Sequence, residues 1–212
     1  MPPTSTSVPA AIGVETPSGR RLLDALLAFL VRRRILLSAI VFVALVAKDV
    51  VYGIKPHDLV SLDDPLGLVG LFLVMVGLAL RSWAAGILHK NARLTTTGPY
   101  SLIRNPLYAG SFLMMFGFCA LLNNLVDLWI ILGLVLLLYV VKVRQEEQLL
   151  ARLFPDDWTA YARSTPRFVP RLARRDLRAD WRLSQWLRSR EYQALGATLV
   201  ALVALKLWQI YG

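Results

Sequence analysis

The sequence predicts an all-α integral membrane protein with about five transmembrane helices, two of which form a helical hairpin. Hydrophobic residues make up 56% of its 212 residues and the mean hydropathy is +0.53, which is high for a soluble globular protein. Several apolar stretches approach the roughly 20 residues that cross a bilayer. A chain of this length is expected to form one domain.

Five stretches are apolar enough to be spans, and they cover residues 35–53, 66–88, 107–122, 125–143 and 194–211. Asn123 and Asn124 form a short polar turn between the third and fourth stretches, so these two are expected to form the hairpin. The third stretch is the shortest, which indicates either little tilt or an end below the lipid headgroups.

Residues 1–34 precede the first span and have two parts. Residues 1–19 are rich in Pro, Ser and Thr, a composition typical of a disordered tail. Residues 22–31 are an apolar run between arginine clusters, but Asp24 interrupts the run and no small-residue cleavage site follows, which argues against a signal peptide. We expect an amphipathic helix on the membrane surface instead.

The charge distribution predicts the orientation. The net charge is +10, and 12 of the 24 Lys and Arg residues lie between Lys142 and Arg190. The strongly basic segments all fall on one side of five alternating spans, and the positive-inside rule makes this side cytoplasmic, in an expected bacterial inner membrane. The N-terminus and the insert 146–193 are then cytoplasmic and the C-terminus is outside. Basic residues beside long apolar spans are typical of contact with anionic lipid and not of nucleic-acid binding.

Within the insert, residues 146–153 are expected to continue the fourth helix. Asp156 or Asp157 is a candidate cap for a short helix after Pro155. Residues 166–170 are expected to be extended, because Pro disfavours helix in the residue before it. Residues 181–188 resemble an interfacial helix with tryptophans at headgroup level.

Polar residues flank the hairpin at two places. Gly98–Gly110 is a glycine- and proline-punctuated segment that leads into the third span, and Glu146–Glu147 ends the fourth. Both helix ends lie on the predicted cytoplasmic side, where they can form a pocket for a cationic cofactor. Carboxylates at a helix C-terminus oppose the helix dipole, which favours a bound cation there.

The loop contains an ordinary helix start, since Pro106 is suited to the first helical position and Asn105 can cap it. Arg104 and Tyr108 are four residues apart and can share a helix face. With Tyr100 they place two aromatic rings and one guanidinium at a membrane entrance. A simple aromatic belt explains the rings equally well.

Other charged residues near the spans have simpler explanations. Lys48 is expected to snorkel rather than pair with Asp49, because adjacent residues do not share a helix face. Arg81 either snorkels or holds a carboxylate at the pocket. Lys142 and Glu146 have the spacing of an ion pair on a helix surface.

No metal site is expected, because His57 and His89 are isolated and Cys119 is the only cysteine. Cys119 lies in an apolar run and is expected to be a small buried hydrophobe. No glycine-rich phosphate loop follows a strand pattern, which excludes a Rossmann-type nucleotide site.

Six short motifs occur in order between Leu80 and Pro170. They are Leu80-Arg-Ser-Trp-Ala84, Leu94-Thr-Thr-Thr-Gly-Pro-Tyr100, Arg104-Asn-Pro-Leu-Tyr-Ala-Gly110, Glu146-Glu147 with Phe154, Trp158-Thr-Ala-Tyr161 and Pro166-Arg-Phe-Val-Pro170. This segment resembles the isoprenylcysteine carboxyl methyltransferase family and its bacterial relatives, which share features with phospholipid methyltransferases. The resemblance implies one methyltransferase-like membrane domain over residues 35–212, with S-adenosylmethionine as its cofactor and a lipid or lipidated substrate.

The resemblance also implies roles for particular residues. Cofactor contacts are expected from Ala92, Arg93, Leu94, Thr95, Tyr100, Asn105, Pro106, Leu107, Tyr108 and Glu146. Catalysis is expected to involve Arg104, Glu146 and Glu147, and substrate binding Arg81, Lys142 and Arg144.

The chain departs from the family pattern at three positions. Asn105 stands where His is frequent, Pro155 where Gly is usual, and Lys142 where eukaryotic members carry Arg. Because Lys cannot bind a carboxylate bidentately, the third departure argues against prenylcysteine as the acceptor, although methyl transfer is unaffected. A carboxylate acceptor needs no base, whereas a lipid amine does, and Glu147 is the candidate.

Two other functions fit a membrane protein of this kind. One is an NADPH-dependent reductase of the sterol-reductase type, and the other is a non-catalytic membrane protein. The sequence does not distinguish O- from N-methylation and does not indicate an oligomeric state.

Overall fold

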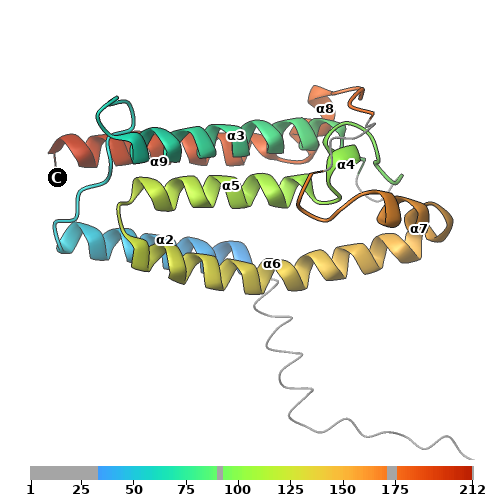
Figure 1. Ribbon diagram of the computed structural model, residues 1–212, viewed down its shortest axis with the longest axis horizontal. Helices are drawn as coiled ribbons and strands as arrows, with labels where there is room; N and C mark the ends of the chain where they lie inside the picture. The colour runs from blue at the N-terminus through green and yellow to red at the C-terminus, as the bar shows by residue number, and fades with distance from the viewer. Residues whose placement is uncertain (1–32, 90–92, 171–175, 212) are drawn as a thin grey trace, which may run out of the picture.

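The structure is a computed structural model that describes residues 33–89, 93–170 and 176–211 (Figure 1). The described residues are all-α, without strands. The helices are α2 (Arg34–Val51), α3 (Pro65–Ile87), α4 (Pro99–Leu102), α5 (Pro106–Leu121), α6 (Leu125–Leu153), α7 (Pro155–Ser164), α8 (Leu183–Arg188) and α9 (Glu191–Tyr211). The predicted tail and surface helix in residues 1–34 lie almost wholly outside the described residues.

The five predicted spans correspond to α2, α3, α5, α6 and α9. Two of the described helices, α3 and α9, are long and apolar enough to cross a membrane, and α5 is a shorter apolar helix. That all five cross the bilayer remains a prediction. The predicted continuation of the fourth helix is confirmed, since α6 runs unbroken to Leu153. The predicted turn between α5 and α6 is also present, with Asn123 in the left-handed region at φ 56°.

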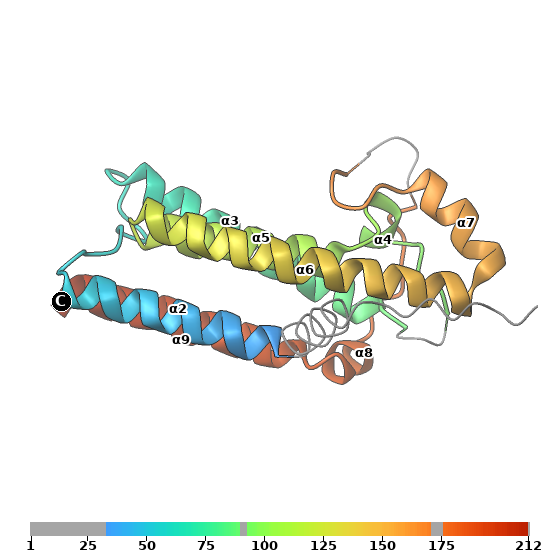
Figure 2. The same ribbon diagram turned by 90° about the horizontal axis from the view of Figure 1, so that it is seen from below.

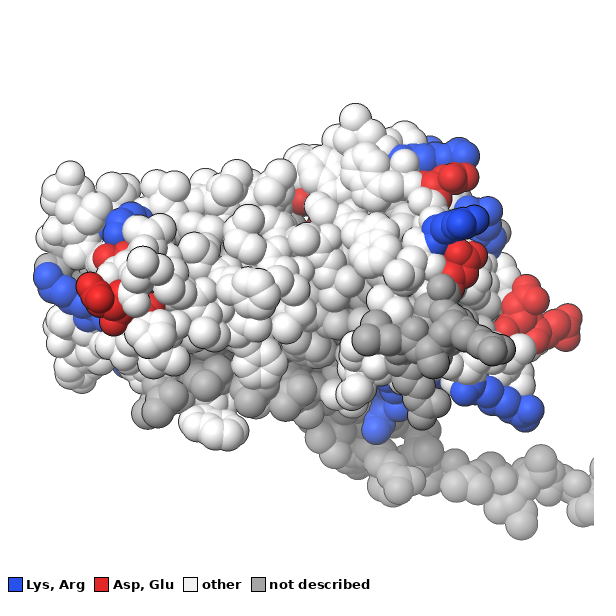
Figure 3. All heavy atoms as spheres, turned by 45° about the horizontal axis from the view of Figure 1, so that its top comes forward, with Lys and Arg blue, Asp and Glu red and all other residues white. Residues whose placement is uncertain are grey.

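The long helices run side by side and their connections gather at two ends (Figures 1 and 2). We call the end that carries α4, α7 and α8 the loop end. The opposite end, with the turn between α5 and α6 and residue Tyr211, is the turn end. Figure 3 shows charged side chains at both ends of the face in view, with a nearly uncharged band between them. This pattern suits a protein that spans a bilayer.

Helices α3 and α5 pack through glycines. A Cβ added to Gly77 would lie 2.5 Å from the carbonyl oxygen of Gly110, and one added to Gly117 would lie 2.5 Å from that of Gly70. Such small residues let membrane helices bring their backbones close together. This contact holds the end of α3 beside the start of α5, where the candidate site lies.

The segment between α7 and α9 attaches to the loop end of α3. Trp181 donates its indole N–H to the Ser82 carbonyl at 3.0 Å, and Trp186 donates to the Ser82 hydroxyl at 2.9 Å. The backbone N–H of Arg182 binds the Gly86 carbonyl. A short helix, α8, therefore lies within the predicted 181–188 stretch, Trp181 just before it and Trp186 inside it both bind α3, and its position at a membrane interface stays a prediction.

Two local predictions are wrong. Asp49 is fully buried and pairs with Lys48, whose Nζ lies 3.2 Å from Oδ1, while Asn124 donates to the same oxygen at 2.8 Å. Burial makes a partner for Asp49 obligatory, and the flexible lysine side chain reaches back to supply one. In α7 the N-cap position is Phe154, without a side-chain cap, and Asp156 and Asp157 lie inside the first turn, where their charge favours the helix dipole.

Two aspartates secure the loop between α2 and α3 at the turn end. Asp64 accepts hydrogen bonds from the N–H groups of Gly67 and Asp58 and from His57 Nδ1. These bonds, the one from Gly67 foremost, lower the pKa of Asp64. The pKa of Asp58 is also well below its usual range, through the N–H of Val60 and then through its contacts with α9.

We expect acid to weaken this loop. A carboxyl group whose pKa is lower in the folded protein than in the unfolded chain stabilises the fold at pH values above its pKa in the unfolded chain. This contribution is lost as the pH falls through its pKa in the folded protein. Replacing Asp64 by Asn should therefore lower the melting temperature at pH 7. The difference in melting temperature between wild type and variant should shrink below about pH 4. The matched control is Asp63→Asn at an exposed neighbour. An equal, pH-independent effect of both substitutions would contradict the expectation.

Candidate functional site

The candidate site is centred on Glu147, at the loop end of α6. Its side chain is buried, with a relative exposure of 7%, and three segments meet around it. Asn105 Nδ2 donates to Oε1 at 3.2 Å, and Arg167 Nε donates to Oε2 at 3.0 Å. Arg167 Nη2 lies 2.9 Å from Oε2, and Arg104 Nη1 lies 3.6 Å from Oε1. These partners give both carboxylate oxygens a hydrogen bond or ion pair, which offsets part of the cost of burying the group.

The start of α5 positions two of these partners. Pro106 occupies the first turn of the helix and Asn105 its N-cap position, but the Asn105 side chain makes no capping bond. It reaches Glu147 instead, so the predicted capping role is wrong. Arg104 is held by its backbone, since its N–H donates to the Pro166 carbonyl at 2.8 Å. The side chain of Arg104 also lies over the Trp158 ring, 5.8 Å from its centroid.

Tyr100 lies in the short helix α4, which follows Gly98 at φ 59°. A Cβ on Gly98 would be strained at this φ and would lie 2.8 Å from Ile87. Tyr161 of α7 donates its hydroxyl to the Tyr100 carbonyl at 2.8 Å, which joins α4 to α7. Burial raises the pKa of the Tyr100 hydroxyl far above its usual range, with nearby charges, Glu146 among them, as smaller contributions. The hydroxyl therefore acts only as a neutral hydrogen-bonding group.

Three buried polar atoms at the loop end lack a hydrogen-bond partner within the described part of the chain. They are the Tyr100 hydroxyl, Arg104 Nε and His89 Nδ1. An unpaired buried polar group costs about 1–3 kcal/mol, so such groups are rare in native structures unless a ligand or water satisfies them. Their grouping at one end indicates a place for a polar ligand.

Aromatic rings form the wall of the site toward the middle of the bundle. The rings of Tyr108 and Tyr139 lie 5.3 Å apart, and Phe112 contacts Tyr139 at 5.5 Å and Phe168 at 5.7 Å between centroids. Tyr139 lies on α6 and Phe168 on the segment after α7. The polar cluster therefore borders an apolar wall.

Not every predicted site residue joins this cluster. Glu146 is partly exposed and pairs with Lys142, whose Nζ lies 3.3 Å from Oε1, as predicted for a surface pair. Arg144 is exposed. Arg81 binds Glu191 of α9 through Nε at 2.7 Å and Nη2 at 3.0 Å, and also donates to Ser111 of α5. Its carboxylate partner is therefore internal.

The remaining predicted cofactor contacts lie on the segment before α4 and at the start of α5. Thr95 is buried and its hydroxyl accepts a 3.3 Å hydrogen bond from the N–H of His89. Leu94 and Leu107 are half-buried, Pro106 is buried and Arg93 is exposed. Ala92 lies outside the described residues.

Arg167 and Glu191 are not among the predicted site residues. Arg167 stands in the Pro166–Pro170 motif, which is expected to be extended and contributes to the family resemblance, but which carries no predicted site role. Glu191 is an acidic residue at the start of an apolar span, and a buried charge next to the hydrocarbon region requires a partner. That requirement was a signal for a pair with Arg81.

Comparison with known proteins identifies the family. The phospholipid methyltransferase family profile matches residues 65–157. The chain is 36% identical over 169 residues to the cobalt-zinc-cadmium resistance protein CzcN of Cupriavidus metallidurans, covering 77% of this chain and 75% of that protein. This chain belongs to the phospholipid methyltransferase family.

A second relative in this family is the nickel-cobalt-cadmium resistance protein NccN of Alcaligenes xylosoxydans xylosoxydans, which is 35% identical over 148 residues, 68% of each chain. No solved structure matches this chain. The resemblance seen in the sequence motifs is confirmed, and the protein is a membrane protein of a methyltransferase family. The segment matched by the family profile contains Tyr100, Asn105 and Glu147, whereas Arg167 and Glu191 lie beyond it.

Proposed function

We propose that this protein is an integral membrane methyltransferase that uses S-adenosylmethionine, with its site at the loop end facing the cytoplasm. The observation that carries the proposal is the buried Glu147 cluster beside the unpaired Tyr100 and Arg104 groups. The family supports methyl transfer, and the basic loop end supports the cytoplasmic orientation.

The residues present fit this cofactor. Glu147 is placed to hold its ammonium group, with Glu146 as the neighbouring acid. The Tyr100 hydroxyl and Arg104 Nε have free hydrogen-bonding capacity, and backbone N–H groups in residues 94–97 suit a carboxylate. When bound, the cofactor supplies a methyl group on a positively charged sulfur. The rings of Tyr100 and Tyr108 offer that charge favourable faces.

The charges around the site favour an anionic acceptor. Four cationic residues surround or neighbour the two carboxylates of Glu146 and Glu147, which we call the acid pair. They are Arg104, Lys142, Arg144 and Arg167. A carboxylate is already ionised at neutral pH, so its oxygen can take the methyl carbon without losing a proton. This chain then has to position the acceptor and needs no base. The aromatic wall of Tyr108, Phe112 and Tyr139 suits a hydrophobic, lipid-like remainder of the substrate.

The test is cofactor-dependent stability of the full-length protein in detergent. A ligand that binds only the native state raises apparent stability by mass action, by about 2.7 kcal/mol at a hundredfold excess over Kd. We expect S-adenosylhomocysteine to raise the melting temperature and NADPH to leave it unchanged. A shift with NADPH alone would support the membrane reductase, and no shift with either would overturn the proposal.

The two relatives are named for resistance to divalent metals, and we propose that this chain supports such resistance through methylation. No group of three or more potential metal ligands occurs among the described residues, which argues against direct metal capture. In a host lacking the gene, wild type should restore growth on cobalt, zinc or cadmium, whereas Glu147→Gln should not. Full rescue by an expressed and folded Glu147→Gln variant would contradict a role for methylation.

A further inference from the structure

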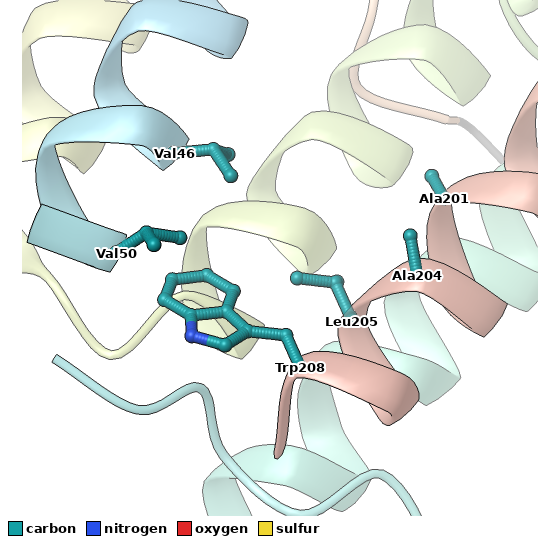
Figure 4. Close-up of a pocket in the computed structure, with 6 residues that line it drawn as sticks. All are labelled: Val46, Val50, Ala201, Ala204, Leu205 and Trp208. Atoms are coloured by element: carbon teal, nitrogen blue, oxygen red, sulfur yellow. The ribbon is translucent and has the colours of Figure 1, made fainter. Parts of the chain in front are cut away.

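An apolar pocket of about 190 Å³ lies between α2 and α9 (Figure 4). The side chains that line it are Val46, Val50, Ala201, Ala204, Leu205 and Trp208. None of these six residues is charged, whereas an ammonium group that leaves water needs an anionic partner. The buried carboxylate of Glu147 at the loop end supplies such a partner, and the pocket between α2 and α9 does not.

The two oxygens of the Glu147 carboxylate have different partners. Oε1 accepts a hydrogen bond from the buried amide of Asn105, and Arg104 Nη1 lies 3.6 Å away, beyond hydrogen-bond distance. Among the described residues, Oε2 is bound by Arg167 alone, through Nε at 3.0 Å and Nη2 at 2.9 Å. Arg167 therefore makes the close charge contact with this carboxylate.

An ammonium group held by Glu147 would compete with Arg167. Oε1 faces the buried Asn105 and the nearly buried Arg104, so Oε2 is the oxygen that a ligand can approach. If Arg167 stayed in place, the ammonium would lie close to two guanidinium groups, and repulsion between like charges would weaken its binding. The ammonium group and the Arg167 guanidinium therefore exclude each other at Oε2.

Arg167 is the partner of Glu147 that can leave. Its side chain is 50% exposed, whereas that of Arg104 is 14% exposed. The backbone on either side of Arg167 is fixed, because the Pro166 carbonyl accepts the Arg104 N–H at 2.8 Å and the Phe168 ring packs on Phe112. Rotation of the side chain is enough to break the contact, and a half-exposed ion pair contributes little to hold it.

We propose that Arg167 is an internal competitor of the cofactor. It binds Glu147 until the ammonium group of the cofactor takes Oε2 and displaces the guanidinium into solvent. Arg167 thereby lowers the affinity of the site, in contrast to the other partners of Glu147. This inference rests on the proposed function, because it requires that Glu147 holds the ammonium group.

The experiment is calorimetric titration of S-adenosylhomocysteine into the full-length protein in detergent. Arg167→Gln should bind this ligand about two- to fivefold more tightly than wild type, because the ligand no longer has to break an ion pair. The matched control is Arg163→Gln, which removes an equal charge from an exposed position at the end of α7 and should leave the affinity unchanged.

Two further measurements separate competition from a purely structural role. An analogue of S-adenosylhomocysteine that lacks the ammonium group should bind wild type and Arg167→Gln equally. Without ligand, Arg167→Gln should melt below wild type, but at saturating S-adenosylhomocysteine the two should melt alike, because neither complex contains the contact between residue 167 and Glu147. A structural role would lower both melting temperatures.

Equal or weaker binding of S-adenosylhomocysteine by Arg167→Gln, with wild type binding it, would overturn the inference and leave the proposed function standing. An absence of binding by wild type would overturn both. If Arg167→Gln does not fold, Arg167→Lys is the second variant. Lysine cannot make the forked contact, so its affinity should lie above that of wild type, and an unchanged affinity would also contradict the inference.

Discussion

Replacing Glu147 by Gln should weaken binding of S-adenosylhomocysteine about 10- to 100-fold. A hydrogen bond to a charged group contributes about 1.5–3 kcal/mol, and each 1.4 kcal/mol changes an affinity tenfold. Gln keeps the shape of the side chain but removes the negative charge that we propose binds the ammonium group of the ligand. The same charge faces Asn105, Arg104 and Arg167. Isothermal titration calorimetry on the detergent-solubilised variant measures the loss directly.

The neighbouring acid is the matched control. Glu146 is partly exposed and its ion pair with Lys142 is of the helix-surface type, which contributes only about 0.2–0.5 kcal/mol. Glu146→Gln should therefore change the affinity less than about threefold. A larger effect of Glu146→Gln than of Glu147→Gln would show that the acid on the outer side of α6 holds the cofactor, and the geometric argument for Glu147 would fail.

Replacing Arg81 by Met should destabilise the protein by about 3–5 kcal/mol, because it leaves the buried carboxylate of Glu191 without a partner. Glu191 has a relative exposure of 2%, and both of its oxygens are bound by the Arg81 guanidinium. This pair joins α3 to α9, and Ser111 extends it to α5. Denaturant unfolding in detergent, followed by tryptophan fluorescence, measures the change.

A double variant separates the cost of an unpaired charge from the loss of an attraction. Arg81→Met with Glu191→Leu removes both charges, and replacing a buried ion pair by apolar residues of similar size is often nearly neutral. We expect the double variant to regain most of the stability that the single variant loses. If the double variant is as unstable as Arg81→Met, the loss of stability comes from the missing attraction between the two side chains and not from the unpaired charge of Glu191.

Particular residues show how far the sequence alone could lead. The helix start at Pro106 and the turn at Asn123–Asn124 follow from local backbone chemistry, and the structure agrees with both. The acid pair was predicted to face the Gly98–Gly110 loop, and Glu147 does contact Asn105. Which of the two acids turns inward could not be predicted, because adjacent residues on a helix point in different directions and only packing selects one.

The sequence by itself determined the all-α architecture, the order of the long apolar helices and the family, because these depend on local composition, helix-start chemistry and short motifs. Only the tertiary structure decided the partners of the buried charges. Arg81 pairs with Glu191, 110 positions away, and Arg167 with Glu147, 20 positions away. A buried charge requires a partner, but nothing in its local sequence says which distant residue will supply it.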